Sequence, residues 1–154
     1  MEIVLVRHGP AGHLDPSRWP DDTERPLSDV DRTRAATAGL VRFLPSLDAV
    51  LASSYARAWQ TAELLHEAGW PEPERLKELE AGVPAIAVVG LLRGRTEQSL
   101  ALVGHEPQLS RLASLLCTGD EHALTLDLKK AGAVGLEDKA LRWVLPPRAL
   151  RFLA

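Results

Sequence analysis

An arginine and a histidine, Arg7 and His8, directly follow an aliphatic run near the start of the chain. The run, Ile3 to Val6, has no polar alternation and is typical of a β-strand covered on both faces. Gly9 and Pro10 then end it. Ligands of open α/β folds bind at the carboxyl edge of the sheet, so we expect the chemistry of this chain where the strand ends.

Two further predicted strands end in the same kinds of side chain. Asp48 to Ala52 is a second covered strand, and the segment Ser53 to Arg57 follows it. Ser99 to Val103 repeats the pattern and is followed by Gly104 and His105. The carboxyl ends of parallel strands share one edge of a sheet. Two arginines and two histidines are therefore expected to converge there, namely Arg7, His8, Arg57 and His105.

Arg57 is expected in the first turn of a helix over Tyr55 to Ala68. A cation there opposes the helix macrodipole, at a cost of about 0.3–1 kcal/mol. An anion held by both the helix amino terminus and the guanidinium would offset that cost, and phosphate is the anion that such a pair suits. The alternative is a solvated surface arginine.

Histidine at a strand end is more often structural than catalytic when it occurs once, but His8 and His105 each follow an aliphatic strand. A neutral imidazole can attack phosphorus and form a covalent phosphoenzyme, while cations stabilise the charge on the equatorial oxygens. Metal binding is the competing interpretation. The five histidines lack a compact ligand spacing and the nearby arginines would repel a dication, so we expect no metal. They are His8, His13, His66, His105 and His122.

Strands and helices alternate along the chain, which predicts one α/β domain over 1–154: a three-layer α/β/α sandwich with a mostly parallel central sheet and an antiparallel C-terminal end. Strands are expected over 3–6, 48–52, 75–79, 99–103, 123–128, 131–137 and 141–145, the last two joined by a hairpin turn at 137–140. Helices are expected over 28–44, with Ser28 as N-cap, and over 55–68, 84–92 and 107–118. An irregular loop over 11–26 is expected to face the site.

Composition narrows the class of protein. The chain has 154 residues and a net charge of −3, which argues against nucleic-acid and membrane-surface partners. No apolar run reaches the roughly 18 residues of a spanning helix, and we expect a cytoplasmic protein. The one cysteine, Cys117, falls in an apolar run and is expected to be a buried, inert thiol.

Several blocks of the sequence resemble, in order, those of the histidine phosphatase superfamily, which includes the phosphoglycerate mutases. Leu5-Val6-Arg7-His8-Gly9 is similar to its Arg-His-Gly signature, and the stretches Ser53 to Ala62 and Val103 to Pro107 are similar to its second and third blocks. The short length, Arg25-Pro26-Leu27-Ser28, Gly-His-Glu-Pro and Lys129-Lys130-Ala131-Gly132 are most similar to SixA-type phosphohistidine phosphatases.

This resemblance implies that His8 is the nucleophile and that Arg7, Arg57 and His105 form the phosphate pocket. It also implies no metal or other cofactor. Gly9 belongs to the phosphate-binding block, and Arg25 would line the mouth or contact phosphate, the alternative being a solvent-facing loop residue.

Ester hydrolysis also needs a general acid. The superfamily places it where Glu78 and Glu80 stand here, and Glu78 matches the position better, although most carboxylates are simply solvated. An imidazole leaves more readily than an alkoxide, so a site with a poor acid would favour P–N cleavage. The mutase pattern continues its first block with Gly-Glu-Ser or Gly-Glu-Thr and a nearby Asn, whereas this chain has Gly9-Pro10-Ala11-Gly12 there and no Asn anywhere, so mutase activity is not expected.

The sequence therefore predicts a metal-independent phosphatase that works through a phosphohistidine intermediate and acts on phosphohistidine in a protein. The alternatives are a phosphatase for a small phosphorylated metabolite and a catalytically silent phosphate-binding module. Lys129 and Lys130 are interpreted as a solvated edge before a strand.

Overall fold

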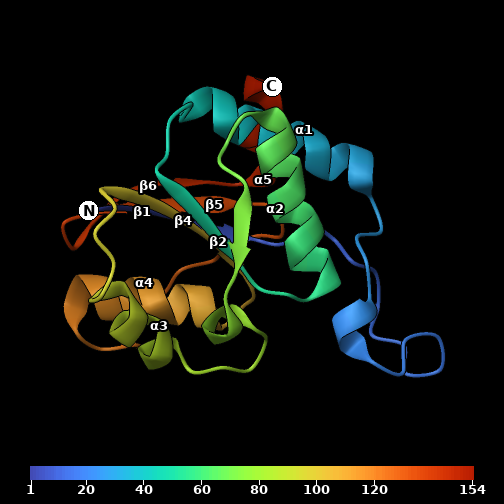
Figure 1. Cartoon of the computed structure of the whole chain (residues 1–154), viewed down its shortest axis with the longest axis horizontal. Helices are drawn as coiled ribbons and strands as arrows, with labels where there is room; N and C mark the ends of the chain where they lie inside the picture. Colours follow the sequence, from blue (N-terminus) through green and yellow to red (C-terminus); the bar gives the residue numbers. More distant parts are fainter.

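A six-stranded mixed sheet forms the centre of the computed structural model, which describes all residues, 1–154 (Figure 1). The strands lie in the order β3-β2-β4-β1-β5-β6; the first four are parallel, and β5 and β6 are antiparallel to their neighbours. Their bounds are β1 (Glu2–Arg7), β2 (Ala49–Ala52), β3 (Pro73–Arg75), β4 (Ser99–Gly104), β5 (Ala133–Glu137) and β6 (Ala140–Leu145). The predicted fold class is confirmed.

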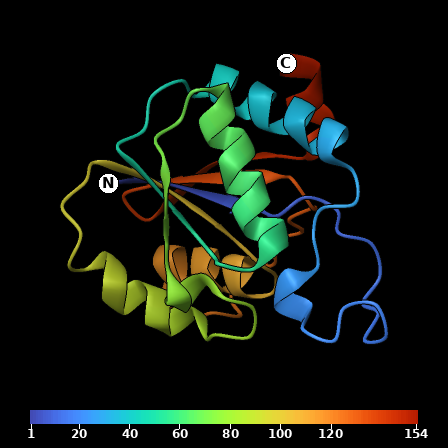
Figure 2. The same cartoon turned by 45° about the vertical axis from the view of Figure 1, so that its right-hand side comes forward.

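Helices cover both faces of the sheet (Figures 1 and 2). Helices α1, α2 and α5 pack on one face and α3 and α4 on the other. Their bounds are α1 (Val30–Phe43), α2 (Ala56–Ala68), α3 (Ala85–Leu92), α4 (Gln108–Thr118) and α5 (Pro147–Leu153), with short 3-10 helices η1 (Asp22–Glu24) and η2 (Lys77–Leu79). None of the helices combines the length and the hydropathy that crossing a membrane requires.

Strand β1 contributes to both cores because its side chains alternate between the two faces. Val4 and Val6 belong to the core under α1, α2 and α5, and Ile3 and Leu5 to the core under α3 and α4. All four are buried. A continuous aliphatic run is thus what a strand between two helix layers needs.

The three strands that precede the chemical residues end side by side. In the parallel register, Arg7 of β1 lies opposite Gly104 of β4, and Ala52 of β2 lies opposite Val103. The residues that follow these strands therefore emerge at one edge of the sheet, as the sequence predicted.

Two strand predictions are wrong. In place of a strand over residues 75–79, β3 ends at Arg75 and residues 77–79 form η2. Residues 123–128 form no strand, because β5 takes the place beside β1. The alternating leucines Leu126 and Leu128 still pack on the core under α3 and α4, which explains their strand-like pattern.

Three smaller details also differ from the prediction. Asp29, not Ser28, caps α1, since its side chain accepts a hydrogen bond from the Arg32 amide. Cys117 is half-buried rather than buried, although burial still raises the pKa of its thiol. Helix α5 was not predicted at all; it packs against α1 through the buried Leu150.

Candidate active site

His8 occupies the end of β1 with its orientation fixed by the backbone. Its amide donates to the Gly104 carbonyl at 3.0 Å, and the ring Nδ1 lies 2.6 Å from the Gly9 carbonyl. A carbonyl only accepts, so Nδ1 carries the proton and Nε2 holds a free lone pair. The side chain is buried, with the residue 7% exposed. This is the tautomer that a nucleophile at Nε2 requires.

The surroundings keep His8 neutral. Burial lowers its pKa to about 4, the hydrogen bond to the Gly9 carbonyl opposes that change, and the charges of Arg57, Arg7 and Lys130 lower the pKa further. At neutral pH the imidazole is therefore unprotonated and able to attack phosphorus.

His105 lies beside His8, with 5.2 Å between the ring centroids. Burial, followed by the proximity of His8 and Arg57, lowers the pKa of His105 to about 3. Its Nε2 lies 2.8 Å from Ser53 Oγ, while its buried Nδ1 has no partner. If the Ser53 hydroxyl donates to Nε2, the neutral ring holds its proton on Nδ1. His105 then offers an unused donor next to the nucleophile.

The two arginines are held by oxygen acceptors on other segments. Arg57 donates from Nη1 to the Asp22 carbonyl and from Nη2 to the Asp22 carboxylate, both at 3.0 Å. Arg7 donates from Nη1 to the Leu128 carbonyl at 2.9 Å. Burial lowers the pKa of Arg57, with Asp22 opposing. Arg57 is thus not the solvated surface residue that the sequence allowed as an alternative, since it is only 4% exposed.

Unused buried donors gather at this place. The molecule has four buried side-chain nitrogen or oxygen atoms without a hydrogen-bond partner, and three of them are Arg7 Nε, Arg57 Nε and His105 Nδ1. Buried polar groups are normally paired because an unpaired one costs about 1–3 kcal/mol. Two guanidinium nitrogens and an imidazole that share this deficit next to His8 are suited to an anion with several oxygens.

These residues line an open hollow of about 330 Å³. Arg7, His8, Arg57 and His105, the four residues whose convergence was predicted, all line it. Its remaining lining residues are Ala11, Gly12, His13, Leu14, Arg25, Ala81, Glu106 and Lys130. We refer to this hollow as the catalytic pocket.

Arg25 and Gly9 hold the neighbouring backbone. Arg25 donates from Nε to Asp22 at 2.8 Å and from Nη1 to the carbonyls of Ala11 and Gly12, so it braces the loop while lining the pocket. The Gly9 amide donates to Thr61 Oγ1 at 3.0 Å, so it already has a partner within the protein. Its carbonyl orients His8.

The sequence offered two candidate acids, Glu78 and Glu80. Glu78, in η2, and Glu80 do not line the catalytic pocket, and Glu80 accepts from Ser54 Oγ at 2.8 Å. Glu106 does line it, a position that the sequence did not indicate. Its carboxylate accepts from the amide and hydroxyl of Ser110. The one carboxylate that lines the catalytic pocket, that of Glu106, therefore already has hydrogen-bond partners.

Asp22 and Lys130 were missed as parts of the site, and Ser53 was predicted there only as part of the segment after the second strand, with no role of its own. Asp22, Ser53 and Lys130 belong to η1, to the end of β2 and to the turn before β5, which sequence distance separates widely. The Lys129-Lys130 similarity was the one sequence signal for Lys130. Of the remaining histidines, His13 lines the pocket, His66 bonds the Trp70 carbonyl and His122 lies beside Glu121.

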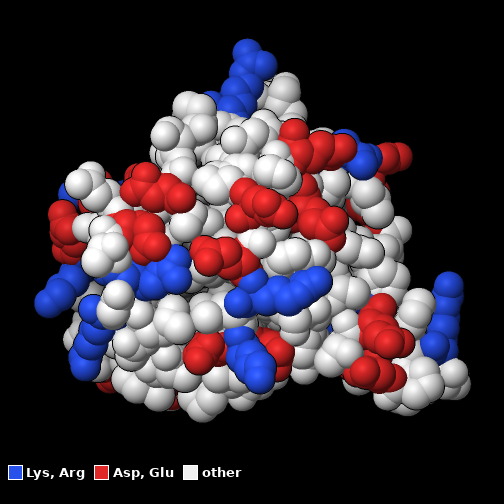
Figure 3. All heavy atoms as spheres, viewed as in Figure 1, with Lys and Arg blue, Asp and Glu red and all other residues white.

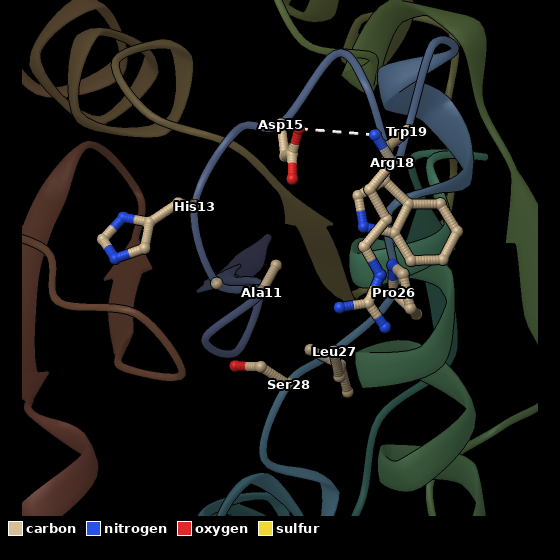
Figure 4. A pocket seen from close by; sticks show the side chains of 9 residues that line it. Ala11, His13, Asp15, Arg18, Trp19, Pro26, Leu27 and Ser28 are labelled. Atoms are coloured by element: carbon tan, nitrogen blue, oxygen red, sulfur yellow. Dashed lines mark hydrogen bonds between the residues drawn. The ribbon is translucent and has the colours of Figure 1, made fainter.

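The loop over 11–28 forms a second hollow next to the catalytic pocket, of about 310 Å³. Figure 4 shows Arg18 and Trp19 on one side of it and His13 pointing away from them. Figures 1 and 2 show that this segment projects beside the amino-terminal end of α2. The loop was predicted to face the site, and His13 and Gly12 line both hollows.

Comparisons with known proteins support the family resemblance that the sequence blocks indicated. Residues 3–88 match the sequence profile of the histidine phosphatase superfamily (branch 1). The uncharacterised protein Rv1276c of Mycobacterium tuberculosis is 38% identical over 109 residues, which cover 66% of this chain and 67% of the relative.

Two solved structures share the fold. The protein histidine phosphatase SixA complexed with tungstate has a TM-score of 0.82 at 24% identity, over 97% of this chain and 99% of that one. A candidate alpha-ribazole-5'-P phosphatase of Escherichia coli K-12 has a TM-score of 0.71 at 19% identity, over 97% of this chain and 98% of that one.

Proposed function

This chain belongs to the histidine phosphatase superfamily (branch 1) and is a hydrolase of the phosphatase type, and from that premise we propose that it removes phosphate from phosphohistidine on proteins through a phosphoenzyme at His8. The observation that carries the proposal is the set of three unpartnered buried donors around a neutral histidine with a free Nε2.

The first step transfers the phosphoryl group. His8 Nε2 attacks phosphorus, the new N–P bond forms, and the bond from phosphorus to the substrate imidazole breaks. The substrate ring, protonated on its other nitrogen by water, leaves as neutral imidazole. Arg7, Arg57 and His105 donate to the equatorial oxygens, where charge is concentrated in the transition state.

Hydrolysis of the phosphoenzyme completes the cycle. Water attacks phosphorus, the bond to His8 Nε2 breaks, and inorganic phosphate leaves with the water oxygen. The proton from water remains on phosphate or solvent, and His8 returns to the neutral tautomer that the Gly9 carbonyl selects. The residues of the pocket supply both steps, and no step of this scheme uses a metal or another cofactor.

The leaving group favours a phosphohistidine substrate. An alkoxide needs a positioned acid, usually worth about 10²–10⁴ in rate. The carboxylate in the pocket, Glu106, is engaged by Ser110, and Glu78 lies outside the lining. An imidazole leaves without such help. A short loop and an open pocket also admit a phosphorylated side chain that stands on a protein surface.

A small phosphorylated metabolite is the second candidate substrate. The hollow that Arg18 and Trp19 line would accept the body of such a molecule beside the catalytic pocket (Figure 4). The Escherichia coli neighbour is a candidate alpha-ribazole-5'-P phosphatase.

A comparison of hydrolysis rates among phosphorylated substrates and an experiment that traps the phosphoenzyme test the proposal. The wild-type protein is expected to cleave a phosphohistidine peptide at least about tenfold faster, in kcat/KM, than phosphoserine or sugar phosphates. Quenching with alkaline detergent during turnover of a radiolabelled substrate should trap on the wild type a phosphate that acid then releases, and none on His8→Ala, which should be inactive. His122→Ala, at an exposed histidine, is the matched control.

Turnover that survives in His8→Ala would refute the mechanism. Faster hydrolysis of sugar phosphates would refute the substrate and favour the metabolite. A protein that binds phosphate and hydrolyses nothing would be the silent module.

A further inference from the structure

Lys130 lines both the catalytic pocket and a third hollow, which is larger. This third hollow, of about 620 Å³, runs between the start of α1, the turn at 129–131 and the start of α5. We call it the basic groove. Its cationic lining residues are Arg32, Lys129, Lys130, Arg148 and Arg151.

The charge of the basic groove is almost uncompensated. One carboxylate, Asp29, is among its lining residues, and it caps α1. Lys129 pairs with Asp127 outside the groove, whereas the other four cations have no carboxylate within 4.0 Å. Elsewhere Arg34 pairs with Asp31 and Glu67, and Figure 3 shows acidic and basic side chains interspersed over the face that α2 and α3 present.

The protein as a whole is acidic, with a net charge of −3. A local cluster of five cations on such a chain is therefore a feature of one surface and not of the composition. Uncompensated like charges repel one another, and an anionic partner removes that cost.

The kind of anion follows from how the cations are displayed. Arg32, Lys130 and Arg148 are exposed, and Arg151 is half-buried. None has a buried, unpartnered donor, in contrast to Arg7 and Arg57 in the catalytic pocket. Long exposed side chains spread over three segments suit several carboxylates at once better than one small, tightly held ion.

We propose that the basic groove binds an acidic segment of the phosphoprotein substrate while the phosphohistidine of that substrate occupies the catalytic pocket. Lys130 lines both hollows and therefore lies between the two bound parts of the substrate. This inference rests on the proposed function. The groove increases the rate of encounter and the affinity for acidic phosphoproteins, and it takes no part in the chemical step.

Two phosphohistidine peptides that differ in charge test the proposal, one with glutamates flanking the phosphohistidine and one with glutamines. The wild type is expected to show a KM about tenfold lower for the acidic peptide at low salt, with similar kcat, and the preference should shrink as salt is raised. The triple variant Arg32→Glu/Arg148→Glu/Arg151→Glu should lose the preference. Its turnover of phosphoramidate, which is too small to reach the groove, should equal that of the wild type.

A matched variant controls for bulk charge. Arg42→Glu/Arg93→Glu/Lys139→Glu changes the net charge equally at exposed residues outside the basic groove. It should keep the preference for the acidic peptide. Circular dichroism and the phosphoramidate rate establish that each variant is folded.

The outcomes separate the two proposals. A wild type that cleaves neither peptide refutes the proposed function and, with it, the groove. A wild type that cleaves both peptides equally, or a groove variant that keeps the preference, refutes the docking surface alone. Equal losses in the two triple variants would assign the effect to net charge and also refute it.

Discussion

At the scale of single residues, the pocket is better equipped to hold phosphate than to protonate a leaving group. Arg7, Arg57 and His105 each present an unused buried nitrogen. The carboxylates have other partners or lie outside the lining: Glu106 accepts from Ser110, and Glu78 is carried on η2. Under the proposed function, the pocket therefore depends on substrates whose leaving group departs without an acid.

A pair of substitutions measures that dependence. Glu78→Gln and Glu106→Gln are each expected to keep kcat for a phosphohistidine peptide within about threefold of the wild type, because loss of a true general acid costs about 10²–10⁴. Stopped-flow phosphate release gives kcat directly. A hundredfold loss for either variant would identify that carboxyl as the proton donor, and for Glu78 it would restore the role that its sequence position suggested.

At the scale of elements, the close contact between α1 and α5 requires a glycine, Gly39, in α1. A Cβ at Gly39 of α1 would lie 1.7 Å from the Leu150 carbonyl oxygen of α5. Because that atom is backbone, the whole of α5 would have to move. Helix α5 begins at Pro147 and carries Arg148 and Arg151, so its position also sets one wall of the basic groove.

Gly39→Ala is expected to lower the free energy of unfolding by about 1–3 kcal/mol through this overlap. Gly90→Ala is the matched control: Gly90 lies in α3, and a Cβ added there would meet no neighbouring atom within 4 Å. Alanine there should raise stability by about 0.5–1 kcal/mol through helix propensity. Urea unfolding of the two variants gives both signs. A neutral Gly39→Ala would mean that α5 has room to shift.

The elements also show what the sequence could and could not predict. Arg7, His8 and His105 were found because they follow aliphatic strands, and the position of a strand covered on both faces is encoded locally by an unbroken apolar run. Helix α5 was not found, since a helix of seven residues that begins at Pro147 has little intrinsic helicity and depends on packing. Partners such as Asp22 and Ser53 depend on tertiary contacts across 35 and 52 residues, which periodicity does not encode.

At the scale of the whole molecule, the two buried histidines link the chemistry to stability. Burial first, then neighbouring charge, lowers the pKa of His8 to about 4 and of His105 to about 3, from 6.5 in the unfolded chain. Below pH 6.5, His8 and His105 bind protons in the unfolded chain but remain unprotonated in the folded protein until the pH approaches their lowered pKa values. The free energy of unfolding must therefore fall as the pH drops from 6.5 towards 4.

Replacing either histidine should remove the part of this pH-dependent decrease in the free energy of unfolding that comes from that histidine. Between about pH 7.5 and about pH 5, each histidine should contribute about 2 kcal/mol of the decrease, since one pKa unit corresponds to about 1.4 kcal/mol. His8→Gln and His105→Gln should each lose less stability than the wild type over this interval, whatever their stability at neutral pH. Urea unfolding at the two pH values gives the double difference, which cancels the packing cost of each substitution. Equal losses in all three proteins would mean that both imidazoles take up protons in the folded state, and the neutral nucleophile assigned to His8 would have to be abandoned.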